Sequence, residues 1–228
     1  MAPAQIPPLE KDYLIVGEGA GDAQFLKYLC DLHDLQDFQI EDAGGSSKFL
    51  SYLKGLSIRP NFERLKAVLI VRDNDDSWED SFGELRKYLK KANLPEPTQP
   101  RQVKRFDHTP DGLAVVVLMI PFTVAGGETR GSLDTLLLRP IEENNAEVAA
   151  CVGTFLGCVN RPRTKNQVDK FRLRCSVAAL YPQDPNCAIQ YVLSPDKNLV
   201  PLTHDCFEEI VAFLRGFIVF CAPPPRRR

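Results

Sequence analysis

The chain has 228 residues, of which 44% are hydrophobic and 25% are charged, and its formal net charge is −2 at pH 7. These values are typical of one large globular domain and exclude a globally basic nucleic-acid binder. No apolar run reaches the roughly 18 residues of a membrane span, so we expect a soluble protein. The seven cysteines lack C-x-x-C spacing and no secretory signal precedes the first predicted strand, which predicts a cytoplasmic protein with reduced thiols.

The first 92 residues alternate between strand and helix patterns after a leader, residues 1–11, that we expect to be disordered. The predicted elements are, in chain order, a strand at Tyr13–Val16, a helix at Asp22–His33, a strand at Phe38–Glu41, a helix after the turn Gly44–Ser47, a strand at Ala67–Val71 and a helix at Ser77–Ala92. Three successive βα units predict an α/β fold, Rossmann-like, with a mostly parallel sheet flanked by helices.

The second half begins with the proline-rich segment Leu94–Pro100, which cannot continue a helix. The predicted elements are then strands at Gln102–Asp107 and Ala114–Ile120, a glycine-rich loop at Thr123–Gly131, helices at Ser132–Leu138 and Glu142–Leu156, and apolar helical faces at Val177–Leu180 and Phe207–Phe217. We predict an α/β domain over residues 12–159, a helical extension over 160–222 and a disordered tail over 223–228. The apolar segment Phe213–Phe220 fits either the core or the interface of a homo-oligomer.

Acidic residues directly follow two of the predicted strands. Glu18 follows Tyr13–Val16, while Asp73, Asp75 and Asp76 follow Ala67–Val71. The carboxyl ends of neighbouring parallel strands share one edge of the sheet, where α/β folds bind ligands. Carboxylates gathered in one crevice repel each other unless a cation neutralises them, and Mg²⁺ takes oxygen ligands. The sequence therefore predicts a site for Mg²⁺ or Mn²⁺ at this edge.

Each acidic cluster also has a structural interpretation. Asp22 opens a predicted helix, and capping of the backbone N–H groups there is favoured over direct metal contact. The run from Asp73 to Asp76 is equally typical of a solvated turn that leads into the helix at Ser77. The functional interpretation gains weight because a buried strand immediately precedes the run.

Other phosphate-handling patterns fit less well. Gly17–Asp22 resembles a dinucleotide-binding loop but has Asp22 where the third glycine belongs, and the absence of a Walker A loop excludes a P-loop ATPase. Asp73-x-Asp75 loosely matches a phosphatase with an aspartate nucleophile, yet it follows the third strand rather than the first and no later Asp-Asp pair exists. A receiver-like phosphoacceptor domain is disfavoured because its acid pair follows the first strand.

Three motifs together resemble the Toprim superfamily, the catalytic domain of topoisomerases, primases and OLD-type nucleases. Glu18-Gly19-x-x-Asp22 and Ile70-Val-Arg-Asp73-Asn-Asp75 resemble its two signature motifs. Gly131-Ser-Leu-Asp134 resembles the Gly-x-Leu-acid element of OLD-like Toprim nucleases and their small stand-alone relatives, although the acid is usually glutamate there. The resemblance covers residues 12–140.

This resemblance implies metal-dependent hydrolysis of phosphodiester bonds in nucleic acid, with DNA favoured over RNA. Asp73 and Asp75 are expected to bind one Mg²⁺ or Mn²⁺, and Asp76 or Asp134 to complete its shell. Glu18 is expected to bind a second ion or to orient the attacking water.

The basic stretch from Arg161 to Arg174 is the predicted phosphate contact. Lys170 or Lys165 within it is expected to neutralise the scissile phosphate, as a C-terminal lysine does in OLD-like relatives. A solvated helix face explains the same residues. A non-catalytic alternative also stays open, in which a Toprim-shaped binding or regulatory protein acts with a separately encoded ATPase.

Overall fold

The structure is a computed structural model that describes residues 7–106, 112–121, 130–159 and 164–222. Its elements are, in chain order, β1 (Tyr13–Gly17), α1 (Ala20–Leu32), β2 (Phe38–Asp42), α2 (Ser46–Leu56), the 3₁₀ turn η1 (Phe62–Arg64), β3 (Ala67–Asp73), α3 (Trp78–Lys91), β4 (Lys104–Arg105), β5 (Ala114–Ile120), α4 (Leu133–Asn144), α5 (Ala146–Val159), α6 (Lys165–Leu180), α7 (Ile189–Val192), the 3₁₀ turn η2 (Asp205–Phe207) and α8 (Glu208–Phe220). The strands form one sheet in the order β2-β1-β3-β5-β4.

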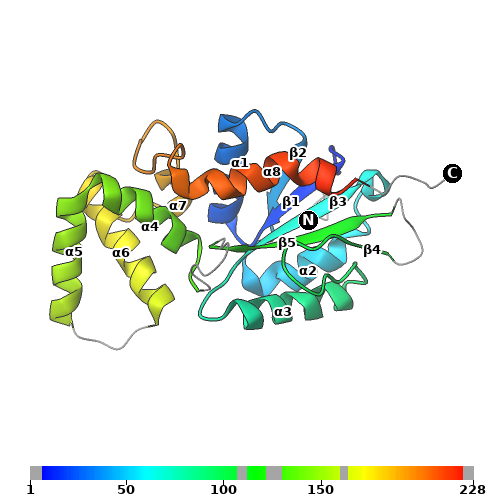
Figure 1. The fold of residues 1–228 in the computed structure, drawn as a ribbon, viewed down its shortest axis with the longest axis horizontal. Helices are drawn as coiled ribbons and strands as arrows, with labels where there is room; N and C mark the ends of the chain where they lie inside the picture. Colours follow the sequence, from blue (N-terminus) through cyan, green and yellow to red (C-terminus); the bar gives the residue numbers. More distant parts are fainter. Residues whose placement is uncertain (1–6, 107–111, 122–129, 160–163, 223–228) are drawn as a thin grey trace, which may run out of the picture.

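The predicted α/β fold is confirmed, because β2, β1, β3 and β5 are parallel and only β4 runs antiparallel. Helices α1 and α8 cover one face of the sheet, and α2 and α3 cover the other (Figure 1). Along β3, Leu69 and Val71 pack toward α1 and α8, while Val68 and Ile70 pack toward α2 and α3. This period-two alternation decides which face each side chain at the end of β3 belongs to.

The C-terminal helices belong to the same core as the sheet. Leu173 of α6 and Leu214 and Phe217 of α8 are buried together with residues of α1, β3 and β5. Helices α4, α5 and α6 pack on one another at the end of the sheet where α4 begins (Figure 1). None of the helices in the described ranges is long and apolar enough to cross a membrane.

Two predicted boundaries differ from the structure. The strand predicted at Gln102–Asp107 is reduced to Lys104–Arg105, and Asp107 lies outside the described residues. Arg101, with a positive φ of 62°, turns the chain just before β4, which shortens the contact with β5. The helix break predicted between 138 and 142 lies instead at Asn145, whose Nδ2 donates to the Ile141 carbonyl at 2.9 Å. Helix α4 continues through Pro140 because its apolar side chains remain buried on one face.

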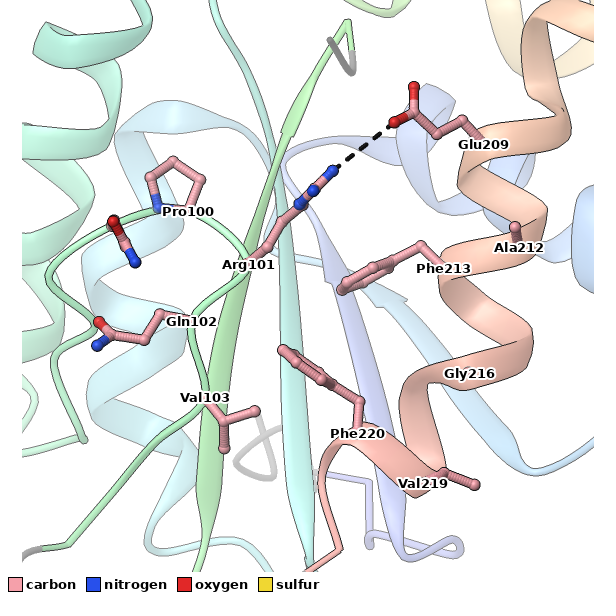
Figure 2. Close-up of a pocket in the computed structure, with 11 residues that line it drawn as sticks. Pro100, Arg101, Gln102, Val103, Glu209, Ala212, Phe213, Gly216, Val219 and Phe220 are labelled. Atoms are coloured by element: carbon pink, nitrogen blue, oxygen red, sulfur yellow. Dashed lines mark ion pairs between the residues drawn. The ribbon is translucent and has the colours of Figure 1, made fainter. Parts of the chain in front are cut away.

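A groove of about 1,160 Å³ lies between α8 and the segment 99–103 (Figure 2). Phe213 and Phe220 point from α8 toward this segment, and Arg101 pairs with Glu209 at 3.7 Å. Phe220 is exposed whereas Phe217 is fully buried. The apolar segment Phe213–Phe220 therefore contributes to the core on one side and to the surface on the other.

Gly17 is required by the close approach of β1 and α1. A Cβ at this position would lie 2.7 Å from Asp22 Cβ and 3.0 Å from the Ala23 nitrogen. We expect Gly17→Ala to lower the free energy of unfolding by about 1–3 kcal/mol, the usual cost of overpacking. Gly83→Ala in α3 is the matched control, because its Cβ meets nothing within 4 Å and helix propensity should stabilise the protein by about 0.5–1 kcal/mol. Urea unfolding of both variants measures the difference, and equal effects would contradict the packing argument.

Candidate functional site

The site lies at the carboxyl edge of the sheet, where β3 meets the beginnings of α1 and α4. Asp73 is the last residue of β3, and its Oδ1 accepts a hydrogen bond from the Leu133 backbone N–H at 2.8 Å. Leu133 opens α4, so a carboxylate is held at the positive end of that helix. The backbones of Asp75 and Gly131 exchange two hydrogen bonds of 2.7 Å, which fasten the chain after β3 to the start of α4.

A cavity of about 440 Å³ opens at this edge between α1, α4, α6 and α7. Its charged lining consists of Asp22, Asp73, Asp134, Lys170 and Arg174. The cavity thus brings together four of the residues predicted from the sequence, from segments up to 148 positions apart, counted from Asp22 to Lys170. Arg174 belongs to the basic stretch of the sequence but was not singled out there.

Asp22 acts as a cap, as predicted. Its Oδ2 accepts a hydrogen bond from the Gly19 backbone N–H at 2.8 Å in the first turn of α1. Burial is the largest of the causes that raise the pKa of Asp22 to about 6, and the charges of Glu18 and Asp134 contribute to the same rise. The pKa of Asp73 is also raised, first by burial and then by the charge of Asp22. A carboxylate pair of this kind is stabilised by a nearby positive charge.

Glu18 lies outside this cavity, on the α2/α3 side of the edge. The alternation of β3 places Arg72 on that side, where its guanidinium carbon lies 5.9 Å from the centre of the Phe49 ring and 6.0 Å from the centre of the Tyr88 ring. Arg72 Nε lies 3.6 Å from Glu18 Oε2, and Arg72 also pairs with Glu84. Burial raises the pKa of Glu18 despite the charge of Arg72, and Asp75 raises it further.

Glu18 Oε2 is buried and has no hydrogen-bond partner among the described residues. Arg72, which offsets the charge of Glu18, is 4% exposed, and its Nε and Nη1 also lack hydrogen-bond partners in that part of the chain. Sequence reasoning assigned no role to Arg72. Its only signal was a charged residue at the end of an otherwise apolar strand.

Asp75 and Asp76 differ in their surroundings. Asp75 has a positive φ of 52°, and its Oδ1 accepts a hydrogen bond from Asn166 Nδ2 at 2.9 Å. The charge of Asp75 contributes to the raised pKa of both Glu18 and Asp73, so it lies within electrostatic range of both sides of the edge. Asp76 is exposed in the turn before α3, which fits the interpretation as a solvated turn.

Asn166 is a positioning residue that sequence reasoning missed. This buried side chain of α6 donates to Asp75 and accepts from Ser132 Oγ at 2.9 Å, so it links the turn after β3 to the N-cap of α4. Thr135 Oγ1 donates to the buried Asp169 at 2.9 Å and adds a second contact between α4 and α6. No periodic pattern signals such a contact, because it depends on how α6 docks against α4.

We expect Asn166→Ala to lower the free energy of unfolding by about 1–3 kcal/mol, because Asp75 and Ser132 both lose a partner. Asn144→Ala, at the exposed end of α4, is the control and should change stability by less than about 0.5 kcal/mol. Chemical denaturation measures both values. A neutral Asn166→Ala variant would contradict the assigned link.

The residues of the basic stretch from Arg161 to Arg174 lie in two kinds of surroundings, the cavity and ion pairs outside it. Lys170 and Arg174 line the cavity, whereas Arg172 pairs with Glu142 at 2.6 Å and Lys165 lies 4.0 Å from Asp169. Arg161 and Arg163 lie outside the described residues. Lys170 makes no hydrogen bond or ion pair with another described residue, and its charge acts on Glu18 across the edge.

No group of three or more His, Cys, Asp or Glu side chains in the described ranges is arranged to hold a metal ion together. Mg²⁺ does not require such a cage, because it usually keeps several waters and binds through one or two carboxylates and substrate phosphates. Asp22 and Asp73, two partly buried carboxylates with raised pKa values that share one cavity, fit this donor chemistry.

Comparison with known proteins identifies a family model that matches most of the chain. A family model described as "Protein of unknown function (DUF3226)" covers residues 11–218. No curated protein and no solved structure matches the chain. The matched range extends from the start of β1 almost to the end of α8, so it includes every residue of the cavity.

Proposed function

Because the chain belongs to the DUF3226 family, whose function is unknown, we propose from the site that it binds Mg²⁺ or Mn²⁺ and hydrolyses phosphodiester bonds of nucleic acid. One observation carries the proposal. Asp22, whose pKa is raised by burial and by the charges of Glu18 and Asp134, and Asp73, whose pKa is raised by burial and by the charge of Asp22, share a cavity with Lys170 and Arg174 at the carboxyl edge of the sheet.

The roles of the residues follow from their charges. Asp73 and Asp22 would hold the cation, and Asp134 lies in the same cavity to hold it directly or through water. The bound cation would supply Lewis-acid activation of a phosphate and of a water molecule. Lys170 and Arg174 would attract the phosphate, and their positive charge would stabilise its developing negative charge. Asp75, fixed by Asn166, and Glu18 are close enough to influence the charge of the site.

The motifs around Glu18, Asp73 and Asp134 support the same function through their resemblance to Toprim nucleases, and this resemblance favours DNA as the substrate. The five-stranded, mostly parallel sheet is compatible with it. Fold likeness by itself does not assign an activity, so the argument depends on the site.

A non-catalytic role, in which the protein binds or regulates together with a separate ATPase, is favoured by one observation. The Glu18 carboxylate lies beside Arg72 rather than in the cavity with Asp73. A carboxylate engaged by a buried cation is less available for a second metal ion. In this case, metal binding would serve recognition and not turnover.

Incubation of the purified protein with labelled single- and double-stranded DNA and RNA, with Mg²⁺ or Mn²⁺, separates the two functions. Nuclease activity predicts metal-dependent cleavage of DNA that is lost in Glu18→Gln and Asp73→Asn, while neither variant melts at a lower temperature than the wild type. Absence of cleavage by the wild type, or equal cleavage by all three proteins, would reject the nuclease and direct the search toward an ATPase partner.

A further inference from the structure

The cavity at the edge of the sheet has one charged wall and one apolar wall. Asp22 of α1, Asp73 of β3 and Asp134 of α4 supply its carboxylates, and Lys170 and Arg174 of α6 supply its cations. Ile189 of α7 and Leu133 of α4 supply apolar surface, and Gln190 adds an amide. A nucleotide carries a phosphate on its sugar and a base with apolar faces and a polar edge, and this lining offers a complement to the phosphate, to the base faces and to the base edge.

The two cations lie four residues apart on α6, which places them on the same side of the helix. Arg174 Nη1 donates to the Cys187 carbonyl at 2.9 Å, which holds the guanidinium against the segment that leads into α7. Its other N–H groups donate to no residue in the described ranges, so they are available to phosphate oxygens, and Arg favours this contact because its donors are planar and paired. Lys170 adds a point charge one turn earlier.

The charge balance of the cavity links this anion site to the cation. Three carboxylates and two cations leave a formal charge of −1, and one divalent ion changes it to +1. A phosphate is therefore repelled from the metal-free cavity and attracted to the metal-bound one. Binding of the phosphate is therefore expected to require the divalent cation proposed above.

The apolar wall stands close to α1. Ile189 Cγ2 lies 3.4 Å from the position that a Cβ on Gly21 would occupy, so the bare backbone of Gly21 leaves room for this contact. The cavity volume of about 440 Å³ falls at the lower end of the range for small-molecule sites, roughly 300–1,000 Å³. A nucleotide enters such a space only when it leaves the base stack of a duplex.

We infer that this cavity takes one nucleotide of a single strand, with its phosphate on Lys170 and Arg174 and its base against Ile189 and Gln190. The inference rests on the proposed function and specifies its substrate class. The same chemistry is presented by a free nucleoside monophosphate and by a nucleotide within a strand. The experiment therefore uses both.

Calorimetric titration of the full chain in Mg²⁺ with deoxyadenosine monophosphate and with inorganic phosphate tests the two walls separately. We expect the nucleotide to bind about tenfold more tightly than phosphate, because its base buries apolar surface. Ile189→Ala should remove this preference, and Tyr191→Ala, on the exposed side of the same short helix, should keep it. Equal binding of nucleotide and phosphate, or equal effects of the two substitutions, would overturn the inference.

Lys170→Gln provides a second variant that does not depend on the packing of α7. It should weaken the binding of both ligands about tenfold. Lys27→Gln removes the same charge from an exposed position of α1 and should leave both affinities unchanged. An equal loss in the two variants would show general charge attraction and overturn the assigned site.

The last arm compares a short oligonucleotide with the blunt duplex that contains it. Single-strand binding at least about tenfold tighter supports the inference, and equal binding of duplex contradicts it. All these readouts are equilibrium binding. If the protein cuts no nucleic acid, the proposed hydrolysis is rejected, but these binding measurements still show whether the cavity takes a nucleotide. Failure of the proposed hydrolysis and failure of this inference are therefore distinguishable.

Discussion

Asp73→Asn is expected to reduce metal-dependent cleavage by about 10³-fold, a loss of about 4 kcal/mol of transition-state stabilisation. Asp73 is the residue most enclosed by other acids, since the charges of Asp22, Asp75 and Glu18 all raise its pKa in addition to burial. Asparagine keeps the oxygen that accepts from the Leu133 backbone N–H. The substitution therefore removes the charge while it preserves the local hydrogen bond.

The same variant should be more stable than the wild type in the absence of metal. A buried carboxylate with a raised pKa costs free energy when it ionises, about 1.4 kcal/mol for each pKa unit. Asp73→Asn should therefore raise the free energy of unfolding near pH 8 while activity disappears. Asp76→Asn, in the exposed turn, should change neither quantity. Loss of activity accompanied by loss of stability would indicate a folding defect and contradict this account.

Stability is expected to fall as the pH rises through about 6, and the ionisation of Asp22 is one cause. Its folded pKa is about 6, whereas an unfolded aspartate titrates near 3.9. The folded state therefore holds the proton more tightly, so this group favours folding at low pH. The contribution disappears between about pH 4 and pH 6 and amounts to at most about 3 kcal/mol.

Divalent cations should reverse this loss. Under the proposed metal site, Mg²⁺ would bind the ionised pair, so its stabilising effect should be large near pH 8, about 1.4 kcal/mol at ten times the dissociation constant, and small near pH 5. Urea unfolding of the wild type and Asp22→Asn at both pH values, with and without Mg²⁺, measures the effect. Asp22→Asn should show a flatter pH profile and little response to Mg²⁺. Identical profiles for the two proteins would contradict the assignment to Asp22.

The architecture was predictable because local patterns and chain topology agree. The apolar runs at 13–16, 67–71 and 114–120 are strands within two residues of the predicted limits, since strands buried on both faces read as continuous hydrophobic segments. Their order forces parallel pairing through helical connections. The acids after β1 and β3 therefore had to lie at one edge of the sheet.

The division of those acids between two sides of the edge was not predicted. Asp73 belongs to the face of α1 and α4, whereas Arg72 directs its charge to Glu18 on the face of α2 and α3. One residue of register along β3 separates the two environments. The sequence alone does not show which face of the sheet each residue of β3 occupies, because that depends on which helices cover each face.

The C-terminal contribution was predicted only in part. Lys170 reaches the cavity as the basic stretch suggested, but Asn166 and Arg174 acquire their roles from the docking of α6 on α4 and α7. Such contacts join residues about 90 positions apart, as between Asp75 and Asn166. Helical periodicity gives little guidance for α6, because its buried side includes the polar residues Asn166, Asp169 and Ser176.

Direct measurement of Mn²⁺ binding tests the central claim, that the carboxylates at the end of β3 hold a divalent cation. Titration of Mn²⁺ near pH 8, followed by electron paramagnetic resonance, counts the ions bound to the wild type and to Asp73→Asn, with Asp76→Asn as control. We predict a saturable site in the wild type and in Asp76→Asn that is weakened by at least about tenfold in Asp73→Asn. No saturable binding by the wild type, or equal binding by all three proteins, would contradict the account.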